Sequence, residues 1–129
     1  MKTEIANRWA DALESGEHTQ AFGALTRSED GSKRTTHCCL GVLCELAIAD
    51  GVDVPKRLIP AHGRLSGYLA LYGSAGEHGY LPSEAQEWAG MRTSAGDFAD
   101  DGRSLSRLND ERVPFSEIAN TIREHAEAL

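Results

Sequence analysis

Residues 37–47 form the most apolar run of the chain and hold all three of its cysteines, Cys38, Cys39 and Cys44. Leucine and alanine recur in this run at helical spacing, which predicts a helix buried on much of its circumference. The preceding residues, 33–37, are polar and rich in threonine, which is typical of a strand. We therefore expect a strand to enter a buried helix through the Cys-Cys junction, and we expect the core to be centred there.

The chain has 129 residues, 40% of them hydrophobic, which predicts one domain over residues 1–129 with a core large enough to need no disulfide. Its formal net charge of −7 argues against sequence-independent binding of nucleic acid or of an anionic membrane, because both require a basic face. An odd number of cysteines indicates reduced thiols, and no stretch has the length of a membrane span. We expect a protein of the bacterial cytoplasm with no cofactor and no metal.

The remaining segments predict an α+β fold that is mainly helical, with one β-hairpin leading into the buried helix. Helical periodicity predicts helices over 3–14, from the cysteines to about Asp50, and over 81–90, 104–109 and 114–128. Residues 21–27 and 33–37 flank an Asp-Gly pair, which indicates a hairpin. Prolines and glycines break every periodic run in 52–80, which we therefore interpret as a long irregular excursion.

Five motifs, in order, resemble a family of small bacteriophage and prophage proteins. They are Trp-x-x-Ala-Leu-x-Ser-Gly at 9–16, Cys-Cys-Leu-Gly-Val-Leu-Cys at 38–44, Leu-Pro at 81–82 followed by Trp88, Leu-x-x-Leu-Asn-Asp at 105–110, and Phe-x-Glu-Ile-Ala-x-x-Ile at 115–122. The resemblance covers most of the chain and implies a phage setting, but it implies no particular activity. Pro114 departs from the family pattern, which has a capping serine there.

The cysteines raise two chemical alternatives. A thiol at a helix start gains from the positive end of the helix dipole, so Cys38 or Cys39 with a histidine and with Asn109 or Asp110 would resemble a papain-like set. This arrangement predicts a Cys-dependent hydrolase or transferase. The structural alternative is that small cysteine side chains fill a tight strand-to-helix junction. Zinc bound by His37 and the cysteines is disfavoured, because no Cys-x-x-Cys pair occurs.

Asn109 and Asp110 favour a structural role. Both residue types form turns and caps, and either side chain could bond the backbone of the cysteine helix.

The predicted hairpin carries the main basic concentration of this acidic chain. Arg27, Lys33, Arg34 and Thr36 lie there, beside the expected start of the cysteine helix. Arginine forks and free helix N–H groups together suit a phosphate-like anion, whereas a solvated hairpin surface is the plainer alternative.

Together these patterns predict a non-enzymatic accessory protein that binds a host protein or a small anionic, nucleotide-like ligand. The phage resemblance adds interference with host defence as an expected role. The rival prediction is the Cys-dependent enzyme, and the patterns leave homo-oligomerisation open.

Overall fold

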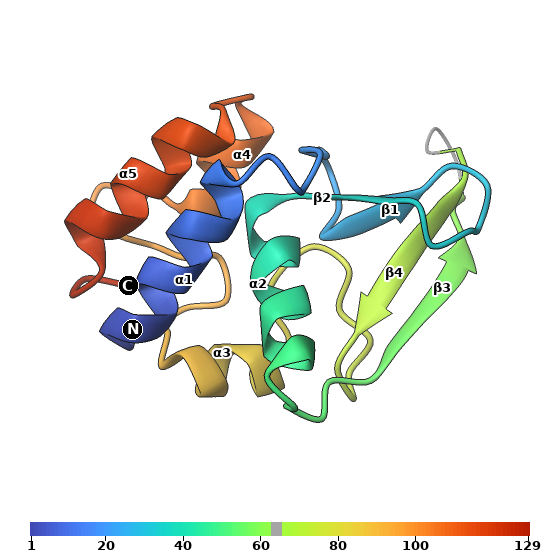
Figure 1. Cartoon of the computed structure of the whole chain (residues 1–129), viewed down its shortest axis with the longest axis horizontal. Helices are drawn as coiled ribbons and strands as arrows, with labels where there is room; N and C mark the ends of the chain where they lie inside the picture. The colour runs from blue at the N-terminus through green and yellow to red at the C-terminus, as the bar shows by residue number, and fades with distance from the viewer. Residues whose placement is uncertain (63–65) are drawn as a thin grey trace.

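Helix α2 (Cys39–Ala49) is the centre of the molecule, as the apolar run predicts. The structure is a computed structural model that describes residues 1–62 and 66–129. Figure 1 shows α2 between a β-sheet on one side and helices on the other. The described elements, in chain order, are α1 (Thr3–Glu14), β1 (Thr26–Ser28), β2 (Thr35–His37), α2, β3 (Lys56–Pro60), β4 (Tyr68–Tyr72), α3 (Ser83–Ala89), α4 (Leu105–Asp110) and α5 (Phe115–His125). The chain is thus a small single α+β domain, which confirms the predicted fold class.

The sheet has four antiparallel strands in the order β2-β1-β4-β3. The predicted hairpin is present as β1 and β2, but its strands are shorter than the predicted 21–27 and 33–37, and they form only half of this sheet. Residues 19–21 run along the free edge of β2, where the N–H of Ala21 donates to the carbonyl of His37 (2.8 Å). The other end of the sheet, β3, is the outermost strand in Figure 1.

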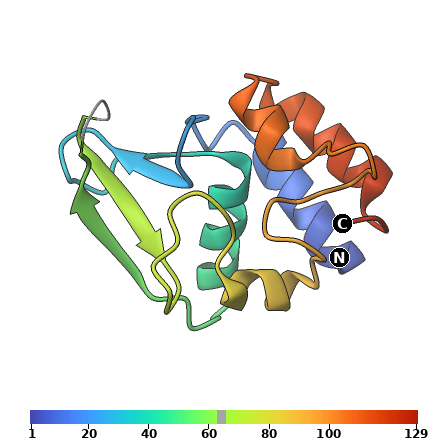
Figure 2. The ribbon, with the colours of Figure 1, turned by 180° about the vertical axis from the view of Figure 1, so that it is seen from behind.

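The irregular excursion predicted for 52–80 is wrong, because β3 and β4 lie within it and pair over five residues each. Pro55 precedes β3 and Pro60 ends it, and proline is tolerated at these positions of an edge strand. Pairing with β4 therefore overrides the breaks that the prolines make in the sequence pattern. Residues 63–65, which belong to the same predicted excursion, lie outside the described residues. Figure 2 shows the segment after β4 passing α2 on its way to α3.

Gly41 explains how closely α2 approaches the hairpin. A Cβ at this position would lie 1.9 Å from the carbonyl oxygen of Leu25, so no other residue fits without moving the backbone. The same carbonyl accepts a hydrogen bond from the N–H of Cys38 (2.9 Å). Glycine in the Cys-Cys-Leu-Gly motif thus permits the strand-to-helix junction to close.

Helix α1 packs on the face of α2 that is turned away from the sheet, and α5 packs alongside α1. Trp9 of α1 is fully buried, and its Nε1 donates to the carbonyl of Cys39 (2.8 Å). Arg123 of α5 forms an ion pair with Asp11 of α1 (2.8 Å). The first and last helices therefore close one core together. None of the helices in residues 1–62 and 66–129 has both the length and the apolar character needed to cross a bilayer.

Candidate functional site

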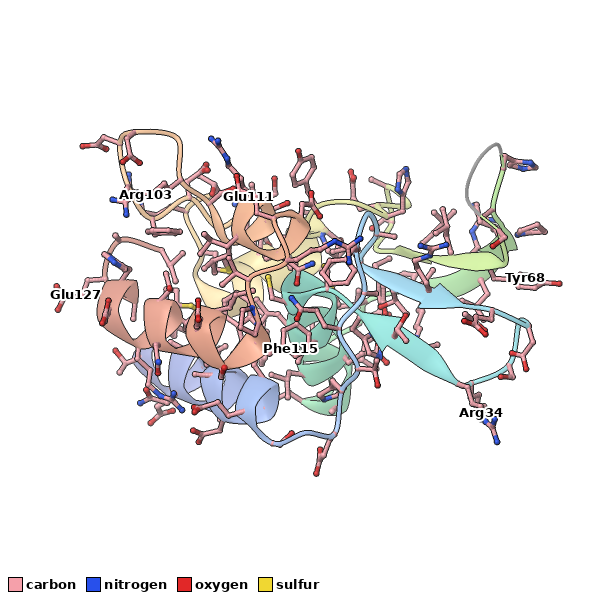
Figure 3. All side chains as sticks on the ribbon, turned by 90° about the horizontal axis from the view of Figure 1, so that it is seen from above. Arg34, Tyr68, Arg103, Glu111, Phe115 and Glu127 are labelled. Atoms are coloured by element: carbon pink, nitrogen blue, oxygen red, sulfur yellow. The ribbon has the colours of Figure 1, made fainter. Side chains whose placement is uncertain are left out.

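The face of the sheet opposite α2 carries a groove of about 800 Å³ over β1 and β2. Arg27 of β1 and Thr36 of β2 form a cross-strand pair on this face, and both line the groove. Arg34 lines it at the end where β2 begins, and Figure 3 shows its side chain extending into solvent from there. Three of the four predicted ligand residues are thus brought to one groove.

Lys33, the fourth predicted ligand residue, lies in the exposed hairpin turn outside the groove lining. The expectation that free N–H groups at the start of α2 join the site is wrong. The N–H of Cys39 donates to Oδ1 of Asn109 (3.1 Å), and the N–H of Gly41 donates to the Cys38 sulfur (3.4 Å). These groups are therefore buried and already bonded within the junction, and neither residue lines the groove.

The basic and the acidic residues of the groove lie in different places. Arg27 and Arg34 lie on the strands, whereas Glu29 and Asp30 lie in the turn. Oδ1 of Asp30 accepts hydrogen bonds from the N–H of Ser32 (2.9 Å) and from Oγ of Ser28 (3.5 Å). These bonds lower the pKa of Asp30, led by the bond from Ser32, so the carboxylate is held in its own loop.

Behind the groove, on the inner face of the sheet, a chain of hydrogen bonds crosses the core from α2 to β2. Glu45 of α2 accepts from Nζ of Lys56 and from the Tyr72 hydroxyl, both at 2.9 Å. Oγ1 of Thr26 lies 2.7 Å from the Tyr72 hydroxyl and 2.7 Å from Nδ1 of His37. Oγ1 of Thr35 ends the chain, 3.1 Å from Nε2 of His37.

The direction of these bonds follows from the carboxylate, which only accepts. Because Tyr72 donates to Glu45, its oxygen accepts from Thr26, and Thr26 then accepts from Nδ1–H of His37. When the His37 ring is neutral, its Nε2 accepts from the hydroxyl of Thr35. Burial lowers the pKa of His37 to about 4 and raises that of Tyr72 well above its ordinary value, so neither group ionises at neutral pH.

Sequence reasoning missed this chain, apart from His37, because its members come from five elements. It has the parts of a proton relay, but the Tyr72 hydroxyl and both nitrogens of the His37 ring have their hydrogen-bond partners within the fold. The chain consequently fixes α2 against the sheet. The strand that carries Tyr72 could have been predicted from the sequence. The apolar run Tyr68-Leu69-Ala70-Leu71-Tyr72 lies between two glycines, which is typical of a strand.

The surroundings of the cysteines disfavour a nucleophilic site. Cys39 and Cys44 are fully buried, and burial raises the pKa of both thiols well above the usual value. Cys38 borders a pocket of about 180 Å³ together with Asp110, yet burial raises its pKa to about 11. The negative charge of Asp110 raises that pKa further. The thiols therefore stay protonated at neutral pH, when a nucleophile needs the thiolate.

Asn109 is the residue that joins the junction to the rest of the core. Its Oδ1 accepts from Cys39 N–H and from Nε2 of Gln20 (3.0 Å), and its Nδ2 donates to the carbonyl of Ala21 (2.8 Å). The side chain is almost fully buried. The expectation that Asn109 bonds the backbone of the cysteine helix is confirmed, whereas Asp110 is exposed.

Comparison with known proteins finds one family over nearly the whole chain. Residues 1–126 match the model of DUF8296, a domain of unknown function. No curated protein and no solved structure matches the chain. The matched span includes the groove, the hydrogen-bonded chain and the cysteine junction. The chain belongs to the DUF8296 family.

Proposed function

We propose that this protein is a non-enzymatic accessory protein, of phage type and acting in the host cytoplasm, that binds a small anionic ligand in the outer groove. The observation that carries the proposal is the cross-strand pair of Arg27 and Thr36 on the groove lining, with Arg34 at one end. A guanidinium beside a hydroxyl supplies the donors that a phosphate group requires. The groove volume of about 800 Å³ suits a nucleotide-sized molecule.

Binding rather than catalysis is favoured by the residue types around the groove. Neither histidine nor cysteine is among the described residues that line it, and the thiols elsewhere are protonated. The phage resemblance extends the proposal to a role, which is to sequester a host nucleotide and so to interfere with host defence. The rival proposal, a Cys-dependent hydrolase or transferase, would require Cys38 to ionise inside a pocket that holds an acidic side chain.

Thermal unfolding in the presence of inorganic phosphate and of mononucleotides, dinucleotides and cyclic nucleotides tests the proposal. A ligand that binds only the folded state stabilises it by about 2.7 kcal/mol at a hundredfold excess over its dissociation constant. Arg27→Ala and Arg34→Ala should each abolish the shift while leaving the unliganded melting temperature nearly unchanged, because exposed charges contribute little to folding.

Arg57→Ala is the matched control, because it removes the same side chain from another strand of the sheet. It should leave the ligand shift intact, and so should Lys33→Ala in the hairpin turn. A shift that survives loss of Arg27 would place the ligand elsewhere. No shift with any of these compounds would favour a host protein as the partner.

A further inference from the structure

The two edges of the sheet differ in how they are covered. Residues 19–21 bond to the edge of β2, whereas β3 pairs only with β4 among the described residues. Figure 1 shows no element outside β3. An uncovered edge strand presents backbone donors and acceptors to which another strand can add.

The hydrogen bonds at the two ends of β3 show which groups are free. The N–H of Gly73 donates to the carbonyl of Pro55, and the N–H of Ala61 donates to the carbonyl of Gly67, both at 2.8 Å. Bonded pairs alternate along an antiparallel ladder, so Arg57 and Ile59 also bond to β4. Lys56 and Leu58 therefore direct their N–H and carbonyl groups outward. Pro60 offers only its carbonyl outward, which limits the addition at that end.

Charge at this edge is positive. A depression of about 410 Å³ lies beside it, lined by Lys56, Arg57, Leu71 and the turn 73–76, and none of the described residues on this lining is acidic. The nearby Glu84 carboxylate already accepts from the N–H and the hydroxyl of Ser74, at 2.8 and 2.7 Å. Lys56 is paired with Glu45, but Arg57 is exposed and has no ion-pair partner among residues 1–62 and 66–129. In a chain with a net charge of −7, this is a local site for a negatively charged group.

We propose that the edge of β3 binds an extended acidic segment of another protein, which adds to the sheet as a fifth strand. Lys56 and Leu58 supply four backbone hydrogen bonds to the segment, and Arg57 with the adjacent depression receives an acidic side chain. A second copy of this chain fits the edge less well. It would bring a second Arg57 into the same ladder, and the two net charges of −7 would repel each other.

The probe is an acetylated and amidated peptide, Thr-Val-Glu-Val-Glu-Val-Thr, and its basic counterpart has lysine for glutamate. Amide hydrogen exchange followed by NMR reads the addition directly. In the free protein the amides of Arg57 and Ile59 should be protected, whereas those of Lys56 and Leu58 should exchange freely. The acidic peptide should slow exchange at Lys56 and Leu58 at least tenfold, and the basic peptide should not.

Two further variants separate backbone addition from a simple charge contact. In an added strand, the backbone N–H groups of every second peptide residue point toward β3, and those of the residues between them point away. N-methylation of the residues that point toward β3 should therefore abolish binding. N-methylation of the residues between them should leave the affinity unchanged. Arg57→Glu should weaken the acidic peptide at least tenfold and should now favour the basic one. Arg34→Glu, the same charge reversal at the groove, should change neither affinity.

Three results would overturn the proposal. Unchanged exchange at millimolar acidic peptide would show that no strand adds at this edge. Equal binding of the two peptides would show that charge does not select the partner. Protection of Lys56 and Leu58 in the free protein, with sedimentation as a dimer, would make the occupant a second copy. None of these results depends on the outer groove, which is tested with Arg27 and small anions.

Discussion

The cysteine junction and the outer side of the sheet use their polar groups in opposite ways. At the junction, the N–H groups of Cys38, Cys39 and Gly41 all bond within the fold, and the thiols are buried. On the sheet, Arg34 and Arg57 are exposed to solvent, and the outer edge of β3 has no partner strand within residues 1–62 and 66–129. The stretch with the most reactive residue types is therefore structural, and the groups available to a ligand lie on short strands.

The comparison also separates stability from binding. Substitutions at the junction should lower the free energy of unfolding, because a buried polar group that loses its partner costs the full penalty of its desolvation. Substitutions on the outer sheet should alter binding and leave the fold intact.

Gly41→Ala should give the largest loss of stability on the junction side. The added Cβ would collide with the carbonyl of Leu25, a backbone group that cannot turn aside, so we expect a loss of about 3–5 kcal/mol in the free energy of unfolding. Urea unfolding measures it. Gly79→Ala is the control, because a Cβ there meets nothing within 4 Å and should change stability by less than about 0.5 kcal/mol.

Asn109→Ala should cost somewhat less, about 3 kcal/mol, because it leaves the buried N–H of Cys39 and the carbonyl of Ala21 without partners. The same unfolding assay applies. Asp110→Ala, at the exposed neighbouring position, should have almost no effect. Equal losses in the two variants would contradict the role assigned to Asn109.

Acid should weaken the junction through His37. Its pKa is about 4 in the folded protein and about 6.5 when unfolded, so the unfolded state binds the extra proton more readily. The contribution to stability is complete above pH 6.5 and is lost as the pH falls toward 4, with an upper limit of about 3 kcal/mol. His37→Asn can still donate to Thr26 but cannot ionise, so it should lose less stability than the wild type over that interval. Parallel pH profiles would refute the assignment.

The smallest expected effect is the reaction of the cysteine thiols with a labelling reagent in the folded protein. Iodoacetamide at pH 8 should leave all three cysteines of the folded protein unmodified, because burial keeps them protonated. All three should react once the protein is unfolded in urea. Rapid modification of Cys38 in the folded protein would restore the enzymatic alternative and weaken the contrast between the two regions.

The predictability of each region from sequence follows from how local its interactions are. Helix α1 was predicted with its observed bounds, because its apolar residues repeat along one face. The hairpin was predicted from its turn, and it brought Arg27 and Thr36 together. β3 was missed because its residues are exposed or half-buried and show no clear apolar alternation, so only its pairing with β4 defines it as a strand. Its prolines also resemble breaks in the sequence.

The hydrogen-bonded chain of the core was not predictable in the same way. It joins Thr26, His37, Glu45 and Tyr72, which are separated by as many as 46 residues. No spacing in the sequence marks such a set, because the contacts exist only after the sheet has formed. The outer groove was found in part, since neighbouring strands supply its cationic side chains.

The packing of α1 against α5 has a consequence for how the chain folds. Asp11 contacts Arg123, and Gln20 contacts Asn109, so the core is closed by residues about a hundred positions apart. During synthesis α1 emerges before α5, so α1 can contact α2 but lacks the helix that lies alongside it until α5 has also emerged. We therefore expect the core to close only after α5 has emerged, and folding to be slower than in a bundle built from local contacts. Until then part of the apolar face of α1 remains exposed to chaperones.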